Sequence, residues 1–184
     1  MPELTELLDA ARAGDRQAAD RAFSLLYDDL RQLARSKLRR HQPLTLLDTT
    51  SLVHEVYLKL AGQSALPVAD RHHFFAYAAR VMRSVIVDLA RARLAERRGG
   101  DAEHVALDTD VAERVAAPEN EVLRVHEALE TLAQADEPLA RVVEMRYFGG
   151  MTEAEIAQAM GVSERTVRRQ WERARLLLSV ALEP

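Results

Sequence analysis

The sequence predicts an all-α protein with two small helical domains, an acidic linker between them and a helix-turn-helix in the second. Apolar residues recur at steps of three and four along several stretches, which places them on one face of a helix. No stretch alternates apolar and polar residues long enough for a strand, and neither Asn-Gly nor Asp-Gly occurs. The 184 residues are 48% hydrophobic and 29% charged, which is ordinary for a globular chain of one or two domains.

Helical periodicity fills the first hundred residues. After an acidic, amphipathic start, apolar residues keep the helical spacing along three stretches, 23–38, 52–60 and 74–89. Three or four helices are therefore expected before Gly99, where the last of these patterns ends. We place the first domain at residues 1–98.

An acidic segment separates the two predicted domains. Residues 99–137 contain 11 Asp or Glu and only two Arg, whereas the segments on either side are slightly basic. Apolar periodicity is weak up to Asn120, and Pro118 lies near the end of this stretch. We therefore assign residues 99–120 to a linker.

The second domain is predicted at residues 121–184. Helical spacing returns along 122–132 and again along 139–146, and the second of these helices is closed by a pair of glycines. Two further helix starts follow within residues 152–175. The second domain is thus expected to end in a pair of helices joined by a short turn.

Residues 152–175 have the local features of a helix-turn-helix. Thr152 and Glu155 fit a capping box at the first helix, and Ser163 fits the N-cap of the second. Gly161 lies between the two helices and supplies the turn. The apolar residues expected between the helices are Ile156, Ala157, Met160 and Val162, and the stripe expected to be buried on the second helix is Val167, Trp171, Ala174 and Leu178.

The second helix of this pair is a candidate DNA reader. In a helix-turn-helix the second helix lies in the major groove, and Arg bonds bidentately to guanine O6 and N7. The buried stripe leaves a cationic face outward, and its candidate DNA contacts are Ser163, Arg165, Thr166, Arg168, Arg169 and Arg173. The alternative is an ordinary helical hairpin with an Arg-rich exposed face.

Taken in order, these segments resemble a bacterial RNA polymerase sigma factor of the extracytoplasmic-function (ECF) group in its two-domain form. LLDTTSLVHEVYLKL (46–60) resembles the helix of that family that binds the polymerase clamp, and HHFFAYAARVMRSVIVDLARARLAERR (72–98) resembles its promoter-melting helix. YDDLRQLARSKLRR and PEN also match the family, and TEAEIAQAMGVSERTVRRQWERA resembles its reader of the upstream promoter element. The resemblance implies an initiation factor that binds core polymerase, selects promoters and opens the duplex.

The resemblance also implies roles for single residues of the melting helix. Basic side chains there hold phosphates of the non-template strand and an aromatic side chain stacks on a base. In this chain the resemblance assigns the phosphate contacts to Arg71, Arg80, Arg83, Arg91 and Arg93, and the stacking to Phe74, with Phe75 and Tyr77 as alternatives. Aromatic residues on an apolar stripe are more often part of a core, and this alternative stays open for the aromatic candidates.

The start of the clamp-binding helix departs from the family pattern. Where many relatives have an acidic cluster, this chain has one carboxylate followed by three hydroxyls, and the candidate polymerase-binding residues are Asp48, Thr49, Thr50, Ser51, His54 and Glu55. A phosphate on Thr49, Thr50 or Ser51 adds about −1.5 to −2 charges at pH 7 and restores the missing charge. We therefore expect the subgroup with Thr and Ser in place of the acidic cluster, with a Ser/Thr kinase as activator. The alternative is that these residues only cap the helix.

Several classes of function are excluded by what the sequence lacks. The chain has no Cys, so thiol catalysis and Cys-ligated zinc are excluded. His54-Glu55 begins a zinc-protease pattern, but position 58 is Leu instead of the second His. We expect neither enzymatic activity nor a cofactor or metal, and neither a secretion signal nor a membrane-spanning segment.

The expected partners are core RNA polymerase, promoter DNA and a Ser/Thr kinase, for a cytoplasmic chain that is monomeric when free. The sequence identifies no anti-sigma factor. The main alternative is a dimeric helix-turn-helix regulator that does not associate with polymerase and reads a palindrome. A further alternative is a protein-interaction module that docks through its acidic linker.

Overall fold

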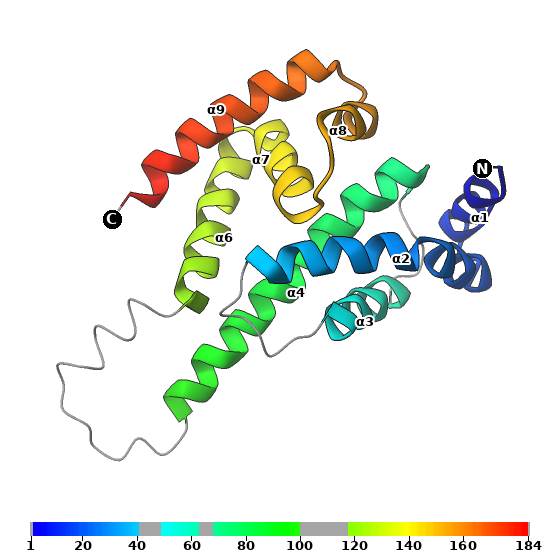
Figure 1. Cartoon of the computed structure of the whole chain (residues 1–184), viewed down its shortest axis with the longest axis horizontal. Helices are drawn as coiled ribbons and strands as arrows, with labels where there is room; N and C mark the ends of the chain where they lie inside the picture. Colours follow the sequence, from blue (N-terminus) through cyan, green and yellow to red (C-terminus); the bar gives the residue numbers. More distant parts are fainter. Residues whose placement is uncertain (1, 41–48, 63–67, 100–117, 184) are drawn as a thin grey trace.

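The structure is a computed structural model that describes residues 2–40, 49–62, 68–99 and 118–183. These residues form helices and turns without any strand, so the predicted all-α class is confirmed (Figure 1). Within this described part, none of the helices is both long and apolar enough to cross a membrane. The helices are α1 (Pro2–Arg12), α2 (Arg16–Arg40), α3 (Thr49–Ala61), α4 (Arg71–Gly99), α6 (Pro118–Ala135), α7 (Glu137–Val143), η2 (Glu144–Phe148), α8 (Glu153–Met160) and α9 (Glu164–Leu182).

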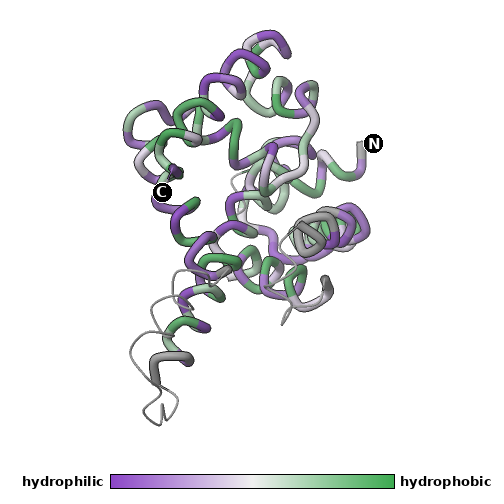
Figure 2. The backbone as a smooth tube through the Cα atoms, turned by 60° about the vertical axis from the view of Figure 1, so that its left-hand side comes forward, coloured by the Kyte–Doolittle hydropathy of each residue, from purple (hydrophilic) through white to green (hydrophobic). Residues whose placement is uncertain are grey.

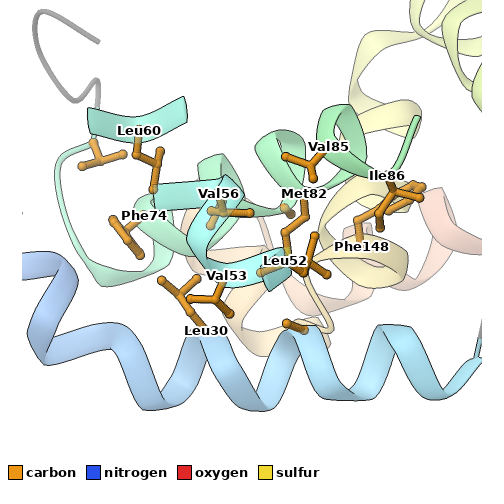
Figure 3. Close-up of a cluster of buried hydrophobic side chains, with 14 of the residues drawn as sticks. Leu30, Leu52, Val53, Val56, Leu60, Phe74, Met82, Val85, Ile86 and Phe148 are labelled. Atoms are coloured by element: carbon orange, nitrogen blue, oxygen red, sulfur yellow. The ribbon is translucent and has the colours of Figure 1, made fainter. Parts of the chain in front are cut away.

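Helices α1 to α4 pack in chain order, each against the next. Figure 3 shows the core between α2, α3 and α4, to which each helix contributes the apolar face that its sequence periodicity predicts. The side chains buried to within 1% of full burial there include Leu30, Val53, Val56, Phe74 and Met82. The 29-residue α4 is the longest of the described helices and reaches beyond this core.

Helices α6 to α9 form the second half of the molecule. α7 packs against both α6 and α9, and α8 packs against α9. A small apolar cluster, which includes Val142, Met145, Ile156 and Val167, holds the last two helices against α7 and η2. Figure 2 shows hydrophobic and hydrophilic residues alternating along the helices of the chain, as expected where one face of a helix is buried.

The two halves share one continuous core. α4 contacts α6, η2 and α8, and the larger buried cluster includes Ile86 from the first half and Phe148 from the second (Figure 3). Most of the predicted linker, residues 100–117, lies outside the described residues. α6 begins at Pro118, so the last three residues that we assigned to the linker belong to the helix that packs on α4.

The segment predicted as one helix over 139–146 is divided in the structure. α7 ends at Val143, and a π-helical turn, η2, continues to Phe148. The Gly149 N–H donates to the Glu144 carbonyl, five residues earlier, at 3.0 Å, which is the hydrogen bond of a π-helix. Met145 and Phe148 are both buried by this turn.

Candidate nucleic-acid and polymerase interfaces

The start of each of the last two helices is fixed by its own side chains. The Thr152 hydroxyl accepts from the Glu155 N–H at 3.3 Å, and the Glu155 carboxylate accepts from the Thr152 N–H at 2.8 Å. The hydrogen bond from the Thr152 N–H lowers the pKa of Glu155, and a second one, which the Thr152 hydroxyl donates to the same carboxylate at 2.8 Å, lowers it further. Gly161 has a φ of 66°, the left-handed conformation that glycine adopts readily, and the Ser163 hydroxyl accepts from the Thr166 N–H at 3.2 Å. Both predicted caps are confirmed.

The apolar contacts between α8 and α9 follow the sequence prediction with one exception. Ile156 and Ala157 are buried on α8, and Val167 and Ala174 are buried on α9. Three further members of the predicted sets, Met160, Trp171 and Leu178, are half-buried. Val162 is 36% exposed and does not close the small clasp that we expected it to complete. It follows Gly161 directly, and the turn there carries its side chain outward.

The outward face of α9 carries arginines in different states. Arg165 and Arg169 are exposed, and neither has an ion-pair partner within the part of the chain that the structure describes. Arg173 is also exposed, with its Nη1 3.4 Å from a carboxylate oxygen of Asp136. Among the candidate DNA contacts, Arg165 and Arg169 are therefore the two cations that are most available to a polyanion.

Arg168 is held by a network that reaches into the domain. Its Nε and Nη2 donate to Glu153 Oε2 at 3.1 and 2.8 Å, and the other oxygen of Glu153 accepts from Arg146 Nη1 at 3.0 Å. The Arg146 guanidinium carbon lies 4.7 Å from the centre of the Trp171 ring. The hydrogen bonds from Arg168 and Arg146 lower the pKa of Glu153, so the carboxylate is charged at neutral pH.

Two of the residues proposed for promoter melting are not exposed on α4. Phe74 is 1% exposed and belongs to the first core, so it presents no face to a nucleobase; its place on the apolar stripe explains this correction. Arg83 is 7% exposed, and its guanidinium is bound by Glu130, Glu144 and His126 from the second half. Burial and the nearby Arg83 charge lower the pKa of His126.

The remaining candidates on α4 differ in exposure. Arg71 forms an ion pair with Asp29 at 2.6 Å and lies over the Phe75 ring. Arg93 is half-buried, with its Nη1 3.7 Å from a carboxylate oxygen of Glu119. Two exposed residues, Arg80 and Arg91, line a cavity of about 540 Å³ between α4 and the second half.

The predicted polymerase-binding residues lie at the start of α3. Thr49 is the first residue of that helix, and Asp48 lies outside the described residues. Thr50, His54 and Glu55 are exposed, whereas Ser51 is half-buried. The structure thus places the exposed candidates on the first two turns of one helix.

A hollow between α3 and α2 adjoins this surface. Its volume is about 480 Å³, and Thr50 and His54 contribute to its wall. At its other end the Tyr57 hydroxyl donates to Asp20 at 3.0 Å, and this hydrogen bond raises the pKa of Tyr57. Thr50 is therefore exposed and borders an open space and not a packed core.

Sequence reasoning missed the partners of the arginines. Glu153, Glu130, Glu144 and His126 each bind an arginine that lies 15 to 61 residues away in the chain. Glu153 has one local signal, because an acidic residue in the first turn of a helix is common. No group of three or more potential metal ligands occurs among the residues that the structure describes.

A comparison with protein families identifies a family that covers almost the whole chain. The family model described as ECF sigma factor matches residues 1–183. No curated protein and no solved structure matches the chain. The match extends over both halves of the molecule, including α3, α4 and the α8–α9 pair.

Proposed function

Because the chain belongs to the ECF sigma factor family, it is an alternative sigma factor that acts with core RNA polymerase on promoter DNA, and we propose that phosphorylation at the start of α3 activates it. The proposed targets are Thr49, Thr50 and Ser51. The observation that carries the proposal is that the first turn of α3 contains no acidic residue but does contain an exposed hydroxyl, on Thr50.

The physical reason lies in the charge that a clamp-binding helix needs. A hydroxyl is a weak substitute for a carboxylate in a charge pair with basic residues of the polymerase. A phosphate at this position carries about −1.5 to −2 charges and lies at the positive end of the helix dipole. Thr50 is exposed beside an open hollow, so a kinase has access to its hydroxyl.

The proposal divides the work between the two halves of the chain. The first half, residues 1–98, binds the polymerase clamp and melts the downstream element, and the second half reads the upstream element through α9. The factor performs no chemistry and needs no cofactor. We propose that it is a monomer when free and that it works in the cytoplasm, where core polymerase and promoters are found.

The test is co-elution of the purified chain with bacterial core polymerase on a size-exclusion column. The unmodified chain is compared with a variant carrying Thr49→Glu, Thr50→Glu and Ser51→Glu. A matched control carries Thr131→Glu, which adds a carboxylate at an exposed threonine of α6. A triple Ala variant at the three α3 positions is tested for promoter activity in cells.

The proposal predicts that the triple Glu variant binds core polymerase more tightly than the unmodified chain and the Thr131→Glu control. It also predicts loss of promoter activity in the triple Ala variant. Equal binding of all forms would show that the hydroxyls are only a helix cap. Specific binding to palindromic duplex DNA without any binding to polymerase would support the dimeric regulator instead.

A further inference from the structure

One face of α4 carries most of the arginines assigned to promoter melting. At 100° per residue, Arg80, Arg83 and Arg91 lie within about 80° of one another around the helix. All three line the same cavity, which α6, α7 and η2 close from the other side. The basic face of the melting helix is therefore turned toward the second half of its own chain.

The opposite wall of this cavity contains three carboxylates and one cation, Arg141 of α7. Glu130 from α6, Glu137 from α7 and Glu144 from η2 face the basic side of α4. Figure 1 shows these three elements grouped on one side of α4. Carboxylates thus occupy the side from which DNA phosphates have to approach the arginines of α4.

Arg83 is the centre of this contact. Its Nη1 donates to Glu144 Oε1 at 2.6 Å, and its Nη2 donates to Glu130 Oε1 at 2.7 Å. The same Nη2 lies 2.8 Å from His126 Nδ1 and 3.2 Å from the His126 carbonyl oxygen. Every one of these partners lies in the second half, and the Arg83 side chain is only 9% exposed. The Arg83 Nε has no hydrogen-bond partner among the described residues, but it is buried, so the side chain is closed to a phosphate in this arrangement.

From this geometry we propose that the second half acts as a lock on the melting helix, with Glu130 and Glu144 occupying the place of DNA phosphates on Arg83. The inference rests on the proposed role of α4 in promoter melting. Single-stranded promoter DNA and the two carboxylates then compete for one basic face. In the structure the basic face of α4 is covered, which is the closed state of the lock. α6 and η2 leave α4 before single-stranded DNA binds.

The chemistry of the contact suits a reversible lock better than a permanent core. A buried ion pair gives little net stability compared with apolar side chains of the same size, because both charges lose their water. When the halves separate, water or phosphate oxygens replace the lost partners of Arg83 at small cost. Ile86 on α4 and Phe148 on η2 add apolar contacts to the closed arrangement, and these contacts also separate when η2 leaves α4.

The test compares two pairs of charge-neutralising substitutions in the full chain. The lock variant carries Glu130→Gln and Glu144→Gln, and the control carries Glu3→Gln and Glu121→Gln at exposed positions. Binding of a fluorescent, random-sequence single-stranded DNA is measured for each chain at fixed salt. Since the chain has no Cys, cysteines placed at Gln32 and Ser179 take a pair of dyes that report the separation of the halves.

We expect the lock variant to show lower energy transfer and to bind the strand at least about fivefold more tightly than the wild type and the control, at the low end of coupling between sites. Arg83→Gln is expected to open the chain as well, but without the gain in DNA affinity. If Arg83 had only a structural role, the lock variant and Arg83→Gln would both bind single-stranded DNA more weakly than the wild type.

Two results distinguish a failure of the lock from a failure of the proposed melting role of α4. If the wild type and the lock variant bind the strand equally and give the same energy transfer, the lock does not exist. If neither form binds single-stranded DNA, and Arg80→Gln and Arg91→Gln change nothing, α4 is not a DNA-binding helix and the proposed melting role fails.

Discussion

At the scale of residues, the arginines of α9 have the same charge but different freedom. Arg165 and Arg169 extend into solvent, and a DNA contact has to fix several rotatable bonds in each. Arg168 is held by Glu153, which takes the Nε donor and one Nη2 donor and leaves three of the five guanidinium N–H groups free. Because its orientation is set before binding, Arg168 loses less entropy than the other two when it contacts a base.

This difference predicts that Glu153 affects base preference although it does not contact DNA. Preferred duplexes are selected from a random pool for the wild type, Arg168→Ala and Glu153→Gln. We expect the first variant to lose about 1–3 kcal/mol of discrimination at one base pair, the usual value of a bidentate contact. Glu153→Gln is expected to weaken discrimination at that same base pair, but by less than Arg168→Ala, because an exposed ion pair contributes only to the orientation of Arg168.

The matched control for this prediction is Glu172→Gln. Glu172 is an exposed acid on α9 that acts on Arg168 only through its charge. If Glu153→Gln and Glu172→Gln change base preference equally, the effect is one of net charge and not of orientation. If Arg168→Ala leaves every preference unchanged, Arg168 does not read a base.

The burial of a single residue could be predicted from sequence only where its neighbours along the same helix determine it. The apolar spacing that includes Phe74, Ala78 and Met82 already places Phe74 in a core, and the structure buries all three. The burial of Arg83 was not predictable, because Glu144 lies 61 residues away and His126 lies 43 residues away. No pattern within one helix identifies partners at that separation.

At the scale of elements, local sequence determines where α8 and α9 begin and end, but it does not determine η2. Neighbouring residues determine the boundaries of α8 and α9, because a capping residue precedes each helix and Gly161 lies between them. The π-helical turn depends on tertiary contact instead. A Cβ at Gly149 would clash with the Met145 carbonyl oxygen of the turn and would lie 3.0 Å from the Ala79 Cβ, so η2 ends at a glycine where the chain also passes close to α4.

The turn between α8 and α9 predicts a clear effect of Gly161→Ala. A Cβ at this position meets no atom within 4 Å, so the cost comes from the positive φ of 66° alone. We expect the free energy of unfolding to fall by about 1–2 kcal/mol, measured by urea denaturation. Gly161→Asn is the matched control, because Asn tolerates the left-handed conformation and should cost less. Equal losses for both variants contradict this assignment of the cost.

At the scale of the whole molecule, two predicted domains form a single packed body. The larger buried cluster runs from Leu4 in α1 to Ala174 in α9 and crosses the predicted boundary. The sequence predicts each helix from its periodicity, but no local pattern predicts that the second half packs on the basic face of α4. Charge provides the reason, since the excess of acid in residues 99–137 lies partly on α6, opposite the arginines of α4.

This packing predicts that the closed molecule is less stable in mild acid. His126 accepts from Arg83 only when its Nδ1 is unprotonated, and Arg83 and Arg91 on α4 add positive charge beside it. Glu127 and Glu130 on α6 oppose this effect in part, but the pKa of His126 is lowered overall, with burial as the largest cause. Glu144 on η2 faces the same guanidinium of Arg83 and keeps its positive charge in place.

The sign of the pH effect follows from proton counts. In the unfolded chain His126 takes up a proton near its ordinary pKa of about 6.5, whereas the folded chain resists protonation until a lower pH. The unfolded state then binds more protons, so the free energy of unfolding falls as the pH drops through this window. Urea midpoints of the wild type at about pH 8 and about pH 6 should show the loss. His126→Asn keeps a hydrogen-bond acceptor without titrating and should lose less stability between the same two pH values. An equal loss of stability in both chains would mean that the surrounding carboxylates cause the pH dependence. His126 would then not contribute to it.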